Sequence, residues 1–219
     1  MTVITGFVGG QSVAFVTDTK QVYFDGRSPN LTSKSLCIPH LHLAIAVRGY
    51  SALLGMIYSA LQAGIPQASD AADVHDGLPD LANMAWRRLR QEYEAVGLSS
   101  DFGAGGQNRP EVLFAGYSSR ASRILARFIS IDDSGKWAAI DLPPGTFFAA
   151  PGIGKEASDR ATAEITGDKR PLADVLFEFA AAQMNANDHF RQMIGGRAVL
   201  TTIGPTGLEQ RPVGTLSNL

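Results

Sequence analysis

Residues 2–18 read TVITGFVGGQSVAFVTD, and this stretch contains the clearest structural signal at the start of the chain. Its first half, Thr2–Val8, is rich in β-branched and aromatic residues, and so is the second run, Ser12–Thr17. Gly9-Gly10 between them is a two-residue turn of the kind that joins antiparallel strands. The stretch therefore predicts a tight β-hairpin, with Asp18 directly past its second strand.

The segments that follow form alternating groups of short strands and helices. Two further strands are expected at 35–38 and 41–47, and from Gly49 the apolar residues recur at intervals of three and four. The expected order is strands, two helices, strands, two helices, strands. Helices that come in consecutive pairs are not βαβ crossovers, which argues against a doubly wound parallel sheet. We therefore expect one α+β domain over residues 1–219, a four-layer αββα sandwich with two stacked antiparallel sheets between two helix pairs.

Three polar or glycine-rich segments are expected to connect these elements, at 67–76, 101–110 and 132–135. The glycines of the second segment are reminiscent of a phosphate-binding loop. They lack the Lys-Ser/Thr ending of a P-loop, however, and they precede a strand rather than a helix. A connector is the simpler interpretation.

The composition narrows the classes of function. The chain has 219 residues, 45% of them hydrophobic, and a formal charge of −2, which gives no support for a nucleic-acid or anionic-membrane partner. No apolar run is long enough to predict a membrane span. The single cysteine, Cys37, and the lack of a secretory pattern favour a cytoplasmic protein. His40 and His42 form an H-x-H pair without a third ligand nearby, so neither a metal nor a cofactor is expected.

The candidate chemistry depends on Thr2. If Met1 is removed, the Thr2 hydroxyl gains a general base in its own α-amine, whose unperturbed pKa of about 8 suits that task. Asp18 lies 16 residues after Thr2, and Lys34 lies 16 residues after Asp18. An ammonium beside the amine would favour its neutral form, and Asp18 could hold Lys34 as an ion partner. Gly49, where a strand gives way to a helix, offers a backbone N–H to a developing oxyanion.

These positions resemble those of the proteasome β-subunits and the bacterial HslV-type peptidase, which are N-terminal-nucleophile hydrolases with an αββα fold. The nucleophilic threonine, the aspartate and the lysine of that family have the spacing of Thr2, Asp18 and Lys34. The later segments Ala150-Pro151-Gly152-Ile153-Gly154 and Gly195-Gly196 resemble glycine-containing turns of the same family.

The resemblance also implies roles for residues around 43–49, where the chain resembles the family's strand into its oxyanion glycine. It assigns the oxyanion role to Gly49 and places Ala46 and Tyr50 beside the substrate pocket. The sequence departs from the family at Arg48, where a glycine is expected, and at Ile194, which takes the place of a serine.

The function implied is a threonine-type endopeptidase or amidohydrolase. It would act on peptide or amide substrates within a homo-oligomeric ring, and an ATP-dependent unfoldase is a conceivable partner. Two alternatives stay open: an unprocessed, inactive homologue that serves as a structural subunit, and a small-molecule amidase of the N-terminal-nucleophile class. The peptide bond between Met1 and Thr2 separates the first alternative from the enzyme, because only its cleavage frees the amine.

Overall fold

The computed structural model describes residues 2–22, 28–64, 67–97, 109–131, 136–186 and 188–217. Met1, residues 101–108 of the expected glycine-rich connector, and the expected turn at 132–135 lie outside the described residues. Within the described ranges the chain forms three antiparallel sheets, six α-helices and one short 3-10 helix. None of these helices is long and apolar enough to cross a membrane.

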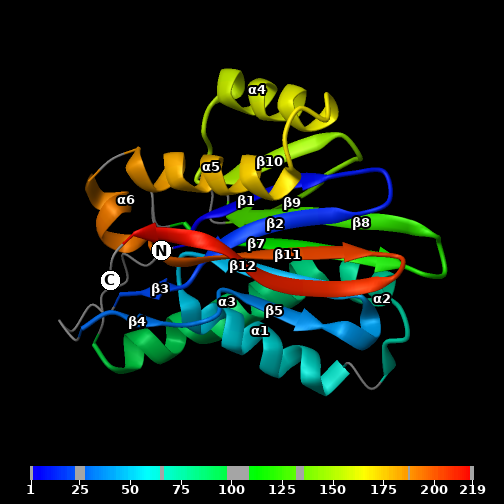
Figure 1. Cartoon of the computed structure of the whole chain (residues 1–219). Coiled ribbons are helices and arrows are strands. Elements are labelled where there is room, and N and C mark those ends of the chain that lie inside the picture. Colours follow the sequence, from blue (N-terminus) through cyan, green and yellow to red (C-terminus); the bar gives the residue numbers. More distant parts are fainter. Residues whose placement is uncertain are drawn as a thin grey trace.

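The first sheet contains the hairpin and has the strand order β10-β1-β2-β11-β12 (Figure 1). In the β1–β2 pair, Ile4 lies opposite Thr17 and Val8 lies opposite Val13. The Gly9 N–H closes the turn by donating to the Ser12 carbonyl at 2.7 Å. The hairpin expected from residues 2–18 is thus confirmed, but its turn contains the four residues 9–12 rather than Gly9 and Gly10 alone. The strands of this sheet are β1 (Ile4–Val8), β2 (Val13–Asp18), β10 (Thr146–Ala150), β11 (Gly196–Gly204) and β12 (Gly207–Ser217).

The second sheet has the order β5-β6-β7-β8-β9, and a third, two-stranded sheet pairs β3 with β4. The 3-10 helix Pro39–Leu41 separates β5 from β6, because Pro39 interrupts the strand pattern. The strands of these two sheets are β3 (Lys20–Gln21), β4 (Asn30–Leu31), β5 (Ser35–Ile38), β6 (Leu43–Arg48), β7 (Glu111–Ser118), β8 (Arg123–Ile131) and β9 (Trp137–Asp141).

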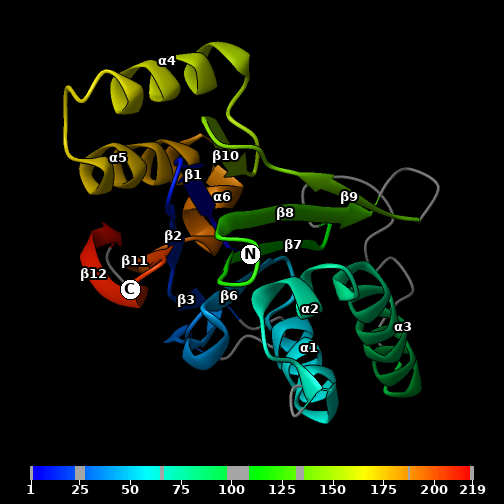
Figure 2. The same cartoon turned by 90° about the vertical axis from the view of Figure 1, so that its right-hand side faces the viewer.

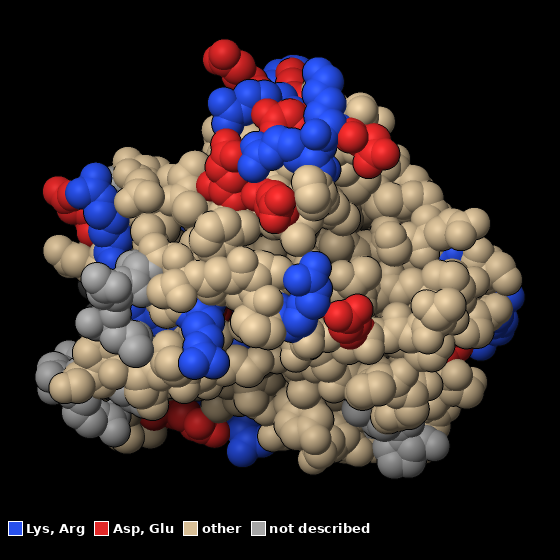
Figure 3. Space-filling model, viewed as in Figure 1, with Lys and Arg blue, Asp and Glu red and all other residues tan. Residues whose placement is uncertain are grey.

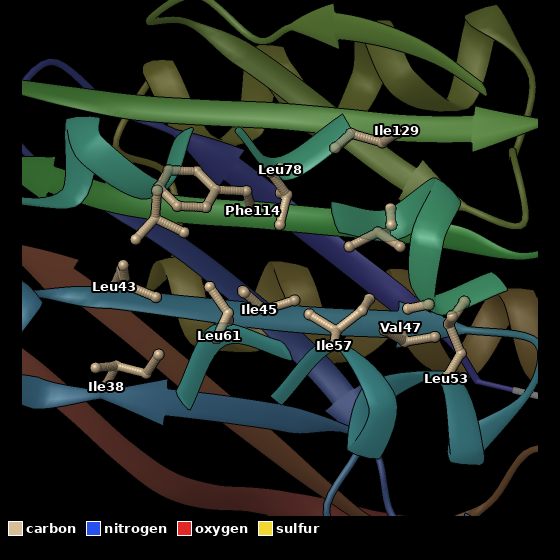
Figure 4. Packing of buried hydrophobic residues seen from close by; sticks show 14 of the residues in the cluster. Ile38, Leu43, Ile45, Val47, Leu53, Ile57, Leu61, Leu78, Phe114 and Ile129 are labelled. Atoms are coloured by element: carbon tan, nitrogen blue, oxygen red, sulfur yellow. The ribbon is translucent and has the colours of Figure 1, made fainter. Parts of the chain in front are cut away.

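The core follows the alternation of side chains along the strands. Ala44 and Ala46 of β6 face the first sheet, where they cluster with Ile4 and Phe15. Ile45, on the opposite face of β6, packs against helices, and Figure 4 shows it near Leu61 and Ile57 of α1. Each fully buried aliphatic side chain of this kind contributes on the order of 2 kcal/mol to folding.

The helices form two groups of three, which lie on opposite sides of the sheets (Figure 2). The first group packs on the second sheet, and the second group packs on the first sheet, where Phe179 and Leu176 are buried. The first group is α1 (Ser51–Gly64), α2 (Ala71–His75) and α3 (Leu78–Ala95), and the second is α4 (Lys155–Thr166), α5 (Leu172–Asn185) and α6 (Asp188–Met193).

The expected four-layer αββα sandwich of two sheets and two helix pairs is therefore wrong. The described residues form a third sheet, and the helices do not divide into two pairs. The elements that were not expected, such as α2 and β3, are short. Caps and contacts with distant residues stabilise them, and the spacing of apolar residues along the chain does not predict such contacts. The expected loop at 67–76 contains α2, because Asp70 caps it by accepting a hydrogen bond from the Ala72 N–H at 2.9 Å. The polar segment that precedes Lys34 contains β3, whose Lys20 N–H donates to the distant Gly195 carbonyl at 3.0 Å.

Candidate active site

Asp18 ends β2 and is completely buried. One carboxylate oxygen accepts a hydrogen bond from the Val3 N–H at 3.0 Å, and the other accepts one from the Gly195 N–H at 3.2 Å. The strand register adds a third constraint, because Asp18 lies opposite Ala198 of β11. Asp18 therefore fixes the start of the first strand, directly behind Thr2, to the turn that begins β11.

The side-chain cation that interacts electrostatically with this carboxylate is Lys34, which is 4% exposed. Burial raises the pKa of Asp18, while the charge of Lys34 and the two backbone N–H donors lower it. Burial likewise lowers the pKa of Lys34, and the charge of Asp18 raises it. Each ionised group is costly to bury alone, so the two charges stabilise each other.

Lys34 is also tied to the second sheet through its backbone. It directly precedes β5, and its carbonyl accepts a hydrogen bond from the Val47 N–H of β6 at 3.2 Å. Thr2, at the start of the chain described, is 1% exposed. The electrostatic pair thus joins the first sheet, which carries Asp18, to the segment of the second sheet that leads to Gly49.

Gly49 lies between β6 and α1 with a φ of 102°, a region that residues with a side chain rarely adopt. Its position two residues before a 14-residue helix places its N–H near the positive end of the helix dipole. The neighbouring Arg48 is 4% exposed, and its guanidinium pairs with Glu111, which lies opposite it on β7. The buried Arg48 guanidinium therefore occupies the position at which the resemblance implied a glycine, and Glu111 balances its charge.

The two residues expected beside the substrate pocket lie in different environments. Ala46 is fully buried between the two large sheets. Tyr50 packs instead on the helical side, with its ring 5.6 Å from Trp86 and 6.4 Å from Tyr93, and burial and then Tyr93 raise the pKa of its hydroxyl. The structure does not bring these two side chains together in one cluster.

Sequence reasoning missed three of the contacts around the site. Glu111 and Gly195 were not assigned a role, because their partners Arg48 and Asp18 lie far away in the chain. The Gln21 side chain donates a hydrogen bond to the Ser51 hydroxyl at 3.1 Å, which connects β3 to the first residue of α1. The Gly195-Gly196 pair was the one available signal, since Gly196 has a φ of 74°.

The sequence also raised expectations about Ile194, the His40–His42 pair and Cys37, which are not among the candidate catalytic residues. Ile194 is fully buried, and its N–H bonds the Phe190 carbonyl at 2.8 Å, so it serves the core around α6. His40 lies in the 3-10 helix and His42 has a φ of 46°, so the H-x-H pair is not on a strand face. In the described ranges no three His, Cys, Asp or Glu side chains form a group that could hold a metal ion. Burial raises the pKa of the Cys37 thiol to about 11, which disfavours the nucleophilic thiolate.

No protein-family description matches the chain, and no curated protein matches it either. Solved structures do match. A mutant of Anbu from Hyphomicrobium sp. strain MC1 aligns with a TM-score of 0.60 at 14% identity, over 98% of this chain and 87% of that one. Anbu (ancestral beta-subunit) from Yersinia bercovieri aligns with a TM-score of 0.59 at 15% identity, over the same shares of the two chains.

These neighbours correct the expected assignment to the proteasome β-subunits and the HslV-type peptidase. Anbu proteins are proteasome-like but form a distinct family. At 14–15% identity the likeness shows the fold alone. The fold of this chain is therefore Anbu-like, and what it does has to be argued from its own residues.

Proposed function

We propose that this protein is a threonine-type peptidase or amidohydrolase, in which Thr2 is the nucleophile after cleavage of the Met1–Thr2 bond. The observation that carries this proposal is the buried Asp18. Its carboxylate accepts a hydrogen bond from the Val3 N–H, directly behind Thr2, and interacts electrostatically with Lys34. Burying two charges together in this way is costly for a fold, and such costs concentrate at functional sites.

The proposed reaction begins when the Thr2 oxygen attacks the carbonyl carbon of an amide. The new C–O bond forms while the hydroxyl proton passes to the free α-amine of Thr2. The tetrahedral intermediate then collapses, the C–N bond breaks, and the leaving amine takes that proton. Water, activated by the same α-amine, hydrolyses the resulting ester and restores the hydroxyl.

The other residues support this sequence of steps. The Gly49 N–H, before the first turn of α1, is the proposed donor to the oxyanion. Lys34 keeps the α-amine in its neutral, basic form by its positive charge, and Asp18 holds Lys34 in position. Ala46 and Tyr50 remain the proposed neighbours of the substrate pocket.

Mass spectrometry of the intact protein tests the first requirement. The active protein should lack the mass of one methionine residue. Purified protein is then assayed with fluorogenic peptide amides and with small amides, to separate a peptidase from a small-molecule amidase.

Two variants at position 2 test the nucleophile itself. Thr2→Ala should lower kcat/KM by at least about a thousandfold, because the attacking oxygen is gone. Thr2→Ser is the matched variant, since it keeps the hydroxyl and should retain activity. Undiminished turnover by Thr2→Ala would refute the mechanism.

A second candidate function is that of a non-catalytic, unprocessed subunit. It is favoured by the burial of Thr2, which is 1% exposed in the full chain and is therefore closed to a substrate. A protein that retains Met1 and hydrolyses no amide supports this candidate. Both candidates include a homo-oligomeric ring, which chromatography coupled to light scattering would detect, and an ATP-dependent unfoldase would be a further partner of the enzyme only.

A further inference from the structure

A pocket of about 430 Å³ lies beside the candidate active site, between the end of β2, the β3–β4 sheet and the β11–β12 pair. Its volume falls in the range of cavities that hold small-molecule ligands. The residues that line the pocket are two arginines, three hydroxyl residues, three apolar residues and one glutamine. None of the lining residues is acidic.

Arg197 on β11 is the cation of the pocket that is available to a ligand. Its backbone N–H donates to the Thr19 hydroxyl oxygen at 2.9 Å, which fixes the start of its side chain against β2. In the part of the chain that the structure describes, no carboxylate lies within ion-pair distance of its guanidinium. The second arginine, Arg211, lies 3.8 Å from Glu209, and both of these side chains are more than half exposed, so this pair neutralises Arg211 only weakly.

Two hydroxyls on the opposite wall can donate hydrogen bonds. The Thr19 oxygen already accepts from Arg197, so its proton remains to be donated to a ligand. Thr32 is partly buried, and within the described ranges its hydroxyl makes no hydrogen bond. Its backbone N–H donates to the Thr19 carbonyl at 2.8 Å, which holds the two hydroxyl residues side by side.

The remaining wall of the pocket is apolar and is formed by Leu31, Val199 and Pro212. Leu31 is 45% exposed, so its side chain is accessible to a ligand in the pocket. Figure 3 shows that charged side chains crowd around α4, whereas the face that carries β11 and β12 has only scattered charges on an otherwise uncharged surface. The pocket therefore combines a cation and hydroxyl donors, which can bind an anionic group, with an apolar wall, which can contact the apolar part of the same ligand.

We propose that this pocket binds a small organic anion, whose carboxylate or phosphate group is held by Arg197 and the Thr19 and Thr32 hydroxyls and whose apolar part lies against Leu31. Arginine matches both anions because its planar guanidinium donates two parallel hydrogen bonds. The pocket is distinct from the candidate catalytic residues, although Thr19 follows Asp18 and the lining residue Ser33 precedes Lys34. The inference does not require that the protein hydrolyses amides, because it concerns binding alone.

Isothermal titration calorimetry on the full chain tests the proposal with four probes: phenylacetate, phenyl phosphate, inorganic phosphate and the uncharged 2-phenylethanol. At constant ionic strength we expect saturable binding of one of the two aromatic anions, with a dissociation constant of about 1 mM or lower. The comparison of phenylacetate with phenyl phosphate identifies the preferred anion. Inorganic phosphate should bind more weakly than phenyl phosphate, because it does not contact the apolar wall.

Three variants connect the binding to the residues named. Arg197→Gln should weaken binding at least about tenfold, and Thr32→Val should weaken it by a few-fold, since each removes a donor to the anion. Arg123→Gln is the matched control, because Arg123 is also an exposed arginine on a strand, but of the second sheet, and binding should be unchanged. Thermal unfolding of each variant verifies that the fold is retained.

Three outcomes would overturn the proposal: no saturable binding of either aromatic anion, equal binding by Arg197→Gln, or equal binding of 2-phenylethanol. The same titration of Thr2→Ala separates this proposal from the proposed function. Anion binding by that variant should match the wild type whether or not the protein proves to be a hydrolase.

Discussion

Replacing Asp18 and Lys34, singly and together, tests whether these two buried charges stabilise each other. Asp18→Ala removes the acceptor of the Val3 and Gly195 N–H groups and leaves the buried Lys34 without its anion. Breaking a buried ion pair from one side costs about 3–5 kcal/mol, and each buried N–H left without an acceptor adds roughly 1–3 kcal/mol unless water reaches it. We expect the single variant to lose at least about 4 kcal/mol of its free energy of unfolding.

The double variant Asp18→Ala/Lys34→Met should lose less than the sum of the two single variants. Its two N–H groups are still without their acceptor, but no unpaired ammonium remains in the interior. The methionine side chain keeps most of the volume of the lysine stem, so packing around it changes little. The interaction energy expected from such a cycle, for two groups in direct electrostatic contact, is about 1–3 kcal/mol.

Urea denaturation at pH 7, followed by circular dichroism, measures the four free energies of unfolding. A total stability of about 5–15 kcal/mol, typical of a domain, leaves a measurable folded population for the milder variants. Lys34→Met alone should abolish hydrolysis if the proposed function holds, and this readout is independent of the stability cycle. Additivity of the two single losses within about 0.5 kcal/mol would refute the mutual stabilisation of the two charges.

Two further changes test how the fold holds the site and one of its helices. Gly196→Ala should lower the free energy of unfolding in urea by about 1–3 kcal/mol, because the φ of Gly196 is 74° and the added Cβ would lie 2.7 Å from the Thr19 hydroxyl oxygen. Gly152→Ala is the control and should lower the free energy of unfolding much less, because the added Cβ would have no atom within 4 Å. Hydrogen bonds from the Ser69 N–H and from Arg120 lower the pKa of Asp73 to about 2, so the folded state binds this proton more weakly than the unfolded state does. The stability that Asp73 contributes should be complete above about pH 5 and be lost progressively as the pH falls through 2. Asp73→Asn should flatten this part of the unfolding free energy measured against pH, and an unchanged slope would contradict the assignment.

Much of the secondary structure could be predicted, because long elements carry their own signal. The period of three to four residues after Gly49 predicted a helix that the structure places at Ser51–Gly64. The short elements β3, α2 and α6 were missed. Their residues lack a clear apolar period, and their conformations depend on caps and on distant backbone partners.

The sequence predicted the candidate site only through the spacing of three residues, and the structure showed what surrounds them. Thr2, Asp18 and Lys34 could be proposed together from residue type and position, but their burial and the N–H groups that hold Asp18 could not. The Arg48–Glu111 pair was also out of reach, since the two residues meet only because β6 and β7 are adjacent strands.

The opening hairpin of residues 2–18 could be predicted from the sequence, because two runs rich in β-branched and aromatic residues flank a glycine-containing turn. The tertiary structure alone decided how that hairpin ends. Gly195, which lies 177 residues after Asp18, donates to its carboxylate, and β11 pairs beside β2 to hold it there. Local patterns specify which face of an element is buried, but the partner that satisfies a buried charge is fixed only when distant segments pack together.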